Sequence, residues 1–194
     1  MEVVEATPLF SIPKQKTGQK GIDTFLRNSY RTHIAYSSLA DKKANIMIKF
    51  NSIVISILIV FFESITDLSP AAYFSGIIFL CSALVSLAFA TLSASPEITK
   101  VNTSKGDLDI RKRNLLFFGN YVDMEIEEYE IAFDAMMQDY KLVYGNMARD
   151  LYFLGKVLDK KFRYLKWSYN TFLTGLGFTV FAFLISLYAR SWIS

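Results

Sequence analysis

The sequence has very little of what enzymes and metalloproteins use for chemistry. It holds one cysteine and one histidine in 194 residues. Cys81 has no second cysteine in this sequence to pair with, so it forms no intrachain disulfide. It lies midway along an apolar run, and we expect it to pack as a small apolar residue. His33 has no second histidine or cysteine nearby to complete a zinc site. Glycine-rich phosphate loops and nucleophile elbows are also missing, so the sequence predicts no enzyme, no metal and no cofactor.

Charge is scarce in three stretches that are long enough to cross a bilayer. These are residues 47–65, 71–94 and 171–192, and a membrane span needs roughly 20 mainly apolar residues. None of them alternates with period two, so all three are predicted to be transmembrane helices. Their strongly polar residues stand near an end, and these are Lys49, Asn51, Glu63 and Arg190. A signal peptide does not fit the first stretch, because about 46 mostly polar residues precede it.

Basic residues lie on one side of the predicted spans. The segment before the first span and the segment between spans two and three are rich in them: Lys14, Lys16, Lys20, Arg27, Arg31, Lys42, Lys43, Lys100, Lys105, Arg111, Lys112, Arg113, Lys160, Lys161, Arg163 and Lys166. Residues 66–70, between spans one and two, contain no lysine or arginine. By the positive-inside rule, the N-terminus and the long middle segment are predicted to be cytoplasmic and the C-terminus to lie outside.

The overall charge balance argues against a nucleic-acid polymer as the partner. The net charge is only +3, because acidic residues of the middle segment offset the basic ones. Phosphate backbones require an excess of basic side chains on one surface. We therefore expect most of these charges to lie on solvated helix faces.

Outside the spans, the sequence predicts helices joined by irregular segments. Residues 1–21 read as a flexible tail, and a helix is expected from a cap at Asp23 or Thr24, with residues 22–46 continuing into the first span. Pro96 is predicted to end the second span, and residues 96–120 to form a loop within a cytoplasmic region, 95–170. From Val122 onward we expect helix, either continuous or as a short acidic helix followed by a very long one.

A heptad pattern runs along the last predicted helix. One row of the repeat holds Met137, Tyr144, Leu151, Leu158, Leu165 and Phe172, and a companion row holds Tyr140, Met147 and Leu154. Lys161 and Ser168 interrupt the companion row near the membrane. Such a stripe packs either on the helix before span one or on a second subunit, and the pattern alone does not choose between them.

Small residues recur at helical spacing within the spans. Ser82, Ser86, Ala90 and Ala94 lie four apart on span two, and Thr171, Gly175 and Thr179 do so on span three. This spacing lets helices approach closely in lipid, either within one chain or between chains.

Several ordered motifs resemble the Pycsar membrane effectors. The first are residues 31–34 (RTHI) and 37–47 (SSLADKKANIM), followed by Asn51 in the first span. Later blocks follow in the same order: Lys105–Gly106, residues 114–120 (NLLFFGN), Glu128–Tyr129, residues 150–156 (DLYFLGK), and Lys160–Lys161 through Tyr169–Asn170. The resemblance covers the chain from about Arg27 to the end of the third span.

The resemblance implies an antiphage effector of the bacterial inner membrane. In such systems a cyclase that senses infection makes cyclic UMP or cyclic CMP, and the effector responds by impairing the membrane, which causes abortive infection. It also implies an all-α membrane protein: three transmembrane helices with long cytoplasmic extensions, packed as a bundle. A homo-oligomer is expected. The alternatives are a constitutive ion channel or transporter subunit, and a non-catalytic membrane scaffold.

The chemistry of a cyclic nucleotide suggests which residues to test as its site. A phosphodiester, a ribose hydroxyl and a flat base require a cation, a hydroxyl partner and an aromatic ring. Residues of these types near the motif blocks are Arg27, Arg31, Asp41, Lys43, Asn45, Arg113, Asn114 and Phe117. Lys49 and Asn51 are candidates for the membrane lesion, because polar groups within a membrane are usually functional. The alternatives are salt bridges and interface packing for the first group, and snorkelling to the headgroups for Lys49.

Overall fold

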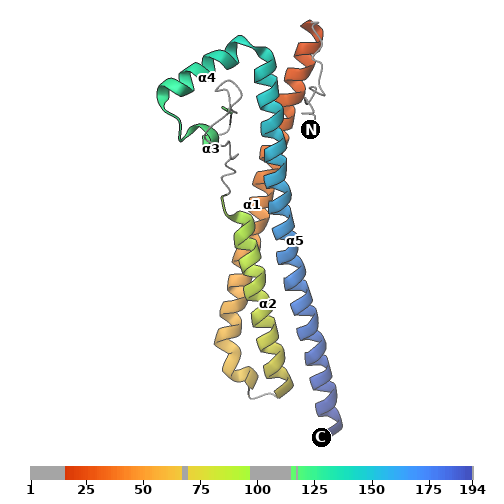
Figure 1. Cartoon of the computed structure of the whole chain (residues 1–194). Helices are drawn as coiled ribbons and strands as arrows, with labels where there is room; N and C mark the ends of the chain where they lie inside the picture. Colours follow the sequence, from red (N-terminus) through yellow and green to blue (C-terminus); the bar gives the residue numbers. More distant parts are fainter. Residues whose placement is uncertain (1–15, 67–69, 97–114, 117, 194) are drawn as a thin grey trace, which may run out of the picture. The chain divides into compact units, whose positions relative to one another are not determined.

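The computed structural model describes residues 16–66, 70–96, 115–116 and 118–193, and these contain helices and no strand (Figure 1). The helices are α1 (Lys16–Thr66), α2 (Pro70–Ala94), α3 (Phe118–Tyr121), α4 (Ile126–Gln138) and α5 (Tyr140–Ile193). By length and composition, α1, α2 and α5 are able to cross a membrane. The expected all-α fold with three membrane helices and long helical extensions is therefore confirmed.

The chain forms two compact units. The first comprises residues 1–34 and 98–155, and the second comprises residues 35–97 and 156–194. Both α1 and α5 contribute to both units. At 1.5 Å per residue, the 51 residues of α1 measure about 77 Å along the helix axis, more than twice the thickness of the hydrocarbon core.

The start of α1 differs from the sequence expectation. The helix begins at Lys16, so Asp23 and Thr24 lie inside it and do not cap it. The hydroxyl of Thr24 instead donates to the carbonyl of Lys20, one turn earlier, at 2.8 Å. Burial of Leu26, at 5% exposure, shows that this part of α1 has a packed face. Packing of that face offsets the cost of Gly18 and Gly21, which have low intrinsic helix propensity.

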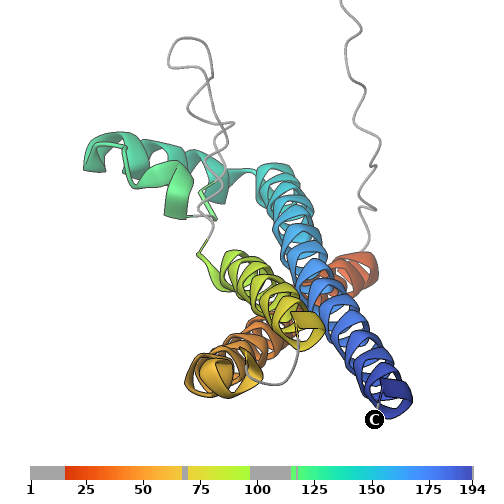
Figure 2. The ribbon, with the colours of Figure 1, turned by 90° about the horizontal axis from the view of Figure 1, so that it is seen from below.

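The second unit is a three-helix bundle of α2 with parts of α1 and α5. Its core takes two residues from each helix: Ala44 and Met47, Phe79 and Ala90, and Leu165 and Phe172. The ring of Phe172 lies 5.3 Å from that of Phe50 and 5.7 Å from that of Phe79, so α5 contacts both neighbours. Figure 2 looks nearly along these helices and shows α2, in yellow-green, beside α1 and α5.

Two sequence predictions about this bundle can now be judged. Leu165 and Phe172 of the heptad row are buried within the same chain, which confirms intrachain packing for that end of the stripe. Cys81, which was expected to pack as a small apolar residue, is exposed, because it faces away from the side of α2 that carries Phe79 and Ala90. Helix α2 ends at Ala94, two residues before Pro96, as predicted.

The first unit has its own small core around the break between α4 and α5. Leu115, Ala132 and Met136 are buried there, with Tyr121 and Tyr129 packed against them. The break occurs at Asp139, whose extended backbone ends α4 and whose carboxylate accepts a hydrogen bond from the backbone N–H of Lys141 at 2.9 Å. Asp139 therefore caps α5, and the alternative of a short acidic helix followed by a very long one is confirmed.

Candidate functional site

Polar side chains face one another inside the second unit, where three apolar helices meet. Two helical turns separate Lys161 from Ser168 on α5, and the same spacing separates Ser86 from Ser93 on α2, so each pair shares a face. We call the whole set the polar ladder. Its members are Ser37, Asp41 and Asn51 on α1, Ser75, Ser82, Ser86 and Ser93 on α2, and Lys161, Ser168, Gly175 and Thr179 on α5.

The first rung joins all three helices through Lys161. Its ammonium donates to Asp41 Oδ1 at 2.7 Å and to Ser37 Oγ at 3.3 Å. Its backbone carbonyl accepts the hydroxyl proton of Ser93 at 2.9 Å. The side chain of Lys161 is 12% exposed and that of Asp41 is 39% exposed. Removing Asp41 would leave a largely shielded ammonium without its counter-ion, which is more costly than breaking a surface pair.

The middle rung joins the helices deeper along the bundle. Asn51, Ser86 and Ser168 are all fully buried. The amide of Asn51 donates to Ser86 Oγ at 3.0 Å and to the carbonyl of Met47 at 2.8 Å. Ser86 Oγ donates to the carbonyl of Ser168, and Ser168 Oγ donates to the carbonyl of Ser86, each at 2.9 Å. This reciprocal serine pair fixes α2 on α5, and Asn51 adds α1.

One atom of this rung is left without a partner. Within the described part of the chain, Asn51 Oδ1 accepts no hydrogen bond, although its surroundings exclude solvent. An unsatisfied buried acceptor costs about 1–3 kcal/mol. The middle rung therefore links the three helices by hydrogen bonds, but it also contains one unpaired buried oxygen, Asn51 Oδ1.

The third rung depends on the absence of a side chain at Gly175. A Cβ on Gly175 would lie 1.9 Å from Ser82 Oγ and 2.3 Å from Ser82 Cβ. Thr179 Oγ1 lies 3.4 Å from the carbonyl of Ser75, one turn further along. The small-residue faces predicted on the second and third spans thus meet each other within one chain.

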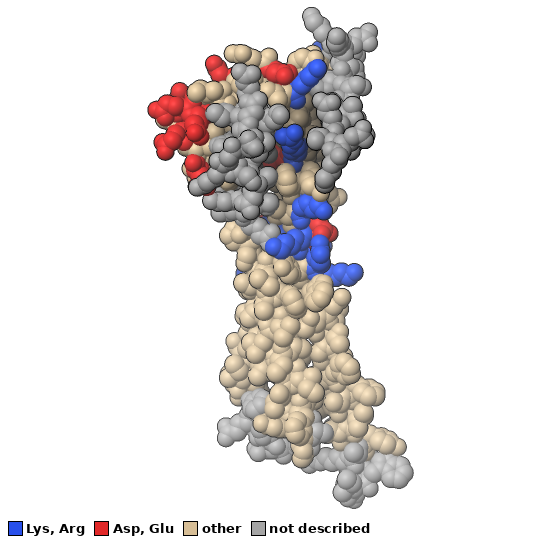
Figure 3. All heavy atoms as spheres, in the orientation of Figure 1, with Lys and Arg blue, Asp and Glu red and all other residues tan. Residues whose placement is uncertain are grey.

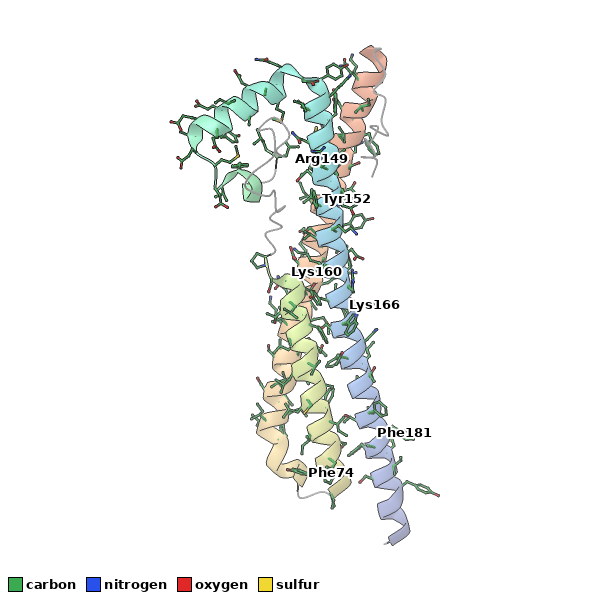
Figure 4. The ribbon with its side chains drawn as sticks, in the orientation of Figure 1. Phe74, Arg149, Tyr152, Lys160, Lys166 and Phe181 are labelled. Atoms are coloured by element: carbon green, nitrogen blue, oxygen red, sulfur yellow. The ribbon has the colours of Figure 1, made fainter. Side chains whose placement is uncertain are left out.

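Charge divides the second unit into two regions. At one end, residues 41–49 and 156–166 carry Lys42, Lys43, Lys49, Lys156, Lys160, Lys161, Arg163 and Lys166 against only Asp41 and Asp159. Figure 3 shows these blue side chains above a long tan surface, and in Figure 4 Lys160 and Lys166 lie at the opposite end of the bundle from Phe74 and Phe181. A basic end beside an apolar wall is the pattern of a membrane helix bundle at its cytoplasmic interface.

In the first unit, two half-buried tyrosines link α1 to α5. Tyr30 donates its hydroxyl proton to Asp150 Oδ2 at 2.8 Å, and Asp150 is 6% exposed. Burial, followed by this hydrogen bond, raises the pKa of Tyr30 well above its ordinary value. Tyr144 donates to Asp23 at 2.6 Å, and that hydrogen bond raises the pKa of Tyr144. His33 Nδ1 is buried and has no partner among the described residues.

The described residues include five of the proposed nucleotide ligands. Arg27 and Arg31 are exposed and lie one helical turn apart on α1, in the first unit. In the second unit Asp41 is paired with Lys161, whereas Lys43 and Asn45 are exposed. Lys43 lies on the opposite face of α1 from Asp41 and Asn45, because successive residues turn by about 100°. The structure therefore brings Asp41 to Lys161 and not to Lys43.

Three nucleotide candidates and the two lesion candidates remain. Arg113, Asn114 and Phe117 lie outside the described residues, so the nucleotide constellation stays a prediction. Of the two lesion candidates, Lys49 is exposed near the basic end, and Asn51 is buried between helices.

Sequence reasoning missed most of the polar ladder. The roles of Ser93 and of the Ser86–Ser168 pair were not predicted, nor was the contact between Tyr30 and Asp150. Signals for single members were present: Lys161 and Ser168 interrupt the apolar companion row on α5, and Ser82, Ser86, Gly175 and Thr179 lie on the predicted small-residue faces. The positions of their partners on α1 and α2 require the packing of the helices to be known.

Together, the three apolar helices, the basic interface and the buried cross-links define a multi-pass α-helical membrane protein. The family model for the Pycsar effector protein domain, PycTM, matches residues 25–189, which is most of the chain. The chain therefore belongs to the Pycsar effector family. No curated protein and no solved structure gave a significant match. Both the membrane fold and the family inferred from the motifs are confirmed, and with them a Pycsar antiphage effector role.

Proposed function

We propose that this protein impairs the bacterial inner membrane when it binds a cyclic pyrimidine mononucleotide, cyclic CMP or cyclic UMP. The nucleotide is made by a cyclase during phage infection, and the damaged membrane stops the infected cell from supporting the phage. The N-terminus and the middle segment lie in the cytoplasm, where the nucleotide is made, and the C-terminus lies outside. The action is physical and not catalytic.

The observation that carries this proposal is the family match over residues 25–189. That range includes parts of all three helices able to cross a membrane and of both units. This supports a single chain that carries both the nucleotide site and the membrane effect. The basic end of the second unit supports the orientation, because basic residues favour the cytoplasmic side.

The nucleotide site of this proposal combines cations with an aromatic ring. Arg27 and Arg31 supply guanidinium groups that suit a phosphodiester, with Arg113 as a third donor. Asn45 and Asn114 offer amides to the base or ribose, and Phe117 offers a stacking surface. Lys43 adds a positive charge. Asp41 would accept from a ribose hydroxyl, and to do so it would have to leave Lys161.

The membrane effect requires more than one copy. The interior of the three-helix bundle is filled by side chains such as Met47, Phe79 and Phe172, so a single copy in this arrangement offers no aqueous path. We propose a homo-oligomer in which Lys49 stands at the cytoplasmic mouth of the lesion. Binding shifts the balance between resting and active states because the nucleotide favours the active one.

Release of a dye from vesicles tests this function. The purified chain is reconstituted into vesicles that contain a small fluorescent dye, and cyclic CMP, cyclic UMP or cyclic AMP is added. We expect release on addition of one of the cyclic pyrimidine nucleotides and none with cyclic AMP. Release without any nucleotide would instead indicate a constitutive channel, and no release at any concentration would indicate a scaffold.

The same vesicles test the nucleotide site. Substituting Arg31→Ala or Arg113→Ala is expected to move the half-maximal nucleotide concentration upward by at least tenfold, since each removes a charge-assisted hydrogen bond. Arg163→Ala is the matched control, because Arg163 is exposed and pairs with Asp159 on its own helix. Unchanged dose dependence in both test variants would overturn the site and leave the function standing.

A further inference from the structure

The second unit hides its polar groups and exposes its apolar ones. Asn51, Ser86, Ser93 and Ser168 are at 0% exposure. Large apolar side chains on the same three helices face outward, among them Ile53 at 58%, Leu84 at 48% and Phe178 at 64%. In water this arrangement would be unfavourable, whereas in lipid the outward apolar side chains meet hydrocarbon and these four buried polar side chains are kept away from it.

We propose that the polar ladder is the latent lining of the membrane lesion. On activation α2 separates from α5 along the Ser86–Ser168 contact, and the exposed hydroxyl and amide groups then line a path for water and hydrated ions. This inference rests on the proposed function and adds the residues that form the lesion. In the proposed open state Asn51 faces the water-filled path, whereas in the closed bundle it is buried.

The contacts along this seam are suited to separation. Where α2 meets α5 at the middle and third rungs, the small groups Ser86, Ser168, Ser82 and Gly175 face one another, and the rings of Phe79 and Phe172 pack beside them. Small groups of this kind interlock little with one another, and water replaces their hydrogen bonds with little loss, since net hydrogen-bond energies are about 0.5–1.5 kcal/mol. Separation therefore breaks the serine contacts at little cost, whereas parting Phe79 from Phe172 and Phe89 from Tyr164 has to be offset by the nucleotide's preference for the open state.

Asn51 biases the bundle toward opening. Its Oδ1 lacks a partner within the described residues, and its amide is already engaged with Met47 and Ser86. Water that enters the seam would satisfy this acceptor and remove the cost of burying it. Asn51 thus stabilises the closed state through the hydrogen bonds of its amide NH₂ group and destabilises it through its unpaired Oδ1.

The first rung is the place where opening is controlled. Its ion pair is the part of the ladder within reach of solvent, because the Asp41 side chain is 39% exposed. Ser37 and Asp41 both bind Lys161, whose carbonyl in turn holds Ser93 of α2. A ligand that draws Asp41 away removes the counter-ion of Lys161, and the first rung is then left with the Ser37 bond to the ammonium and the Ser93 bond to the carbonyl.

A disulfide across the seam tests this inference directly. Ser86 Oγ and Ser168 Oγ lie 3.0 Å apart, so cysteines at both positions are close enough to be joined. We use Ser86→Cys with Ser168→Cys in a Cys81→Ser background, which leaves no other thiol in the chain. The oxidised protein is expected to lose at least nine-tenths of its nucleotide-induced dye release, and a reductant is expected to restore it.

The controls separate this inference from the proposed function. Each single cysteine variant, treated with the same oxidant, provides the reference release for the cross-linked form, because it carries one of the two substitutions and cannot form the bridge. If the native chain releases dye and the verified cross-linked form does so equally, the seam does not open and the inference is wrong. Failure of the disulfide to form would contradict the contact itself, whereas absence of release by the native chain would overturn the proposed function.

Discussion

At the scale of single residues, two glycines on α5 test how closely the membrane helices pack. A Cβ at Gly175 would collide with Ser82, whereas a Cβ at Gly177 would meet nothing within 4 Å. The two substitutions add the same methyl group to the same helix two residues apart. Any difference between them therefore reports the contact with α2.

We expect Gly175→Ala to destabilise the bundle and Gly177→Ala to leave it nearly unchanged. Forcing a methyl group into a packed contact costs about 1–3 kcal/mol, because α2 or α5 has to shift. Thermal unfolding in detergent, followed by circular dichroism, measures the difference. Equal melting temperatures for the two variants would show that α2 and α5 do not approach as described.

Asn51 shows what sequence can and cannot tell about one residue. Its polarity within an apolar run made it a candidate for the membrane lesion. In the structure it is fully buried and bonded to Ser86. Periodicity identifies the face of a helix that is polar, but it does not identify the helix that this face meets.

At the scale of elements, the long helices α1 and α5 were the most predictable part of the chain. The long apolar and heptad patterns before the outer loop and after Val122 favoured long helices, and both α1 and α5 are present. The start of α1 was placed too late because packing of Leu26 compensates for the glycines that precede it. The sequence did not decide whether the helix breaks at Asp139, since aspartate also occurs inside helices and does not always cap one.

Within the first unit, the two tyrosine–aspartate bonds between α1 and α5 form a matched pair. Tyr30→Phe removes the donor from the buried Asp150, so we expect a loss of about 1–3 kcal/mol of unfolding free energy. Tyr144→Phe removes an exposed bond to Asp23 and should cost clearly less. Denaturant titration in detergent compares them, and equal losses would argue against a special role for burial.

The pKa of Tyr30 predicts how this contribution depends on pH. Burial and the bond to Asp150 raise its pKa above the ordinary value of 10.0. The native state therefore retains the phenol proton more tightly than the unfolded chain does. Its stabilising contribution is fully present below pH 10 and is lost as the pH rises above that value. In the Tyr30→Phe variant, the free energy of unfolding should therefore fall less than in the native chain when denaturant titrations are repeated above pH 10.

At the scale of the whole molecule, the sequence predicted what the chain is better than how it works. Spans and family follow from apolar length and ordered motifs, each of which is local in sequence, and the orientation inferred from the basic residues stays a prediction. The polar ladder depends on residues up to 124 positions apart, as in the bond between Ser37 and Lys161. Such pairings are set by packing, and a single sequence contains no direct signal for them.

The central claim is that the described bundle is the closed state of a ligand-operated membrane effector. A single cysteine at position 86, in a Cys81→Ser background, reports that state through its reaction with a charged thiol reagent applied to both sides of vesicles. Ser38→Cys is the control, because Ser38 is exposed on α1 and should react with or without nucleotide.

We predict that the cysteine at position 86 is protected without nucleotide and becomes reactive when the activating cyclic pyrimidine nucleotide is added. The charged reagent reaches only hydrated positions, so the change would place residue 86 on the aqueous path. Reaction at the same rate in both conditions would contradict the account, and so would complete protection while dye escapes.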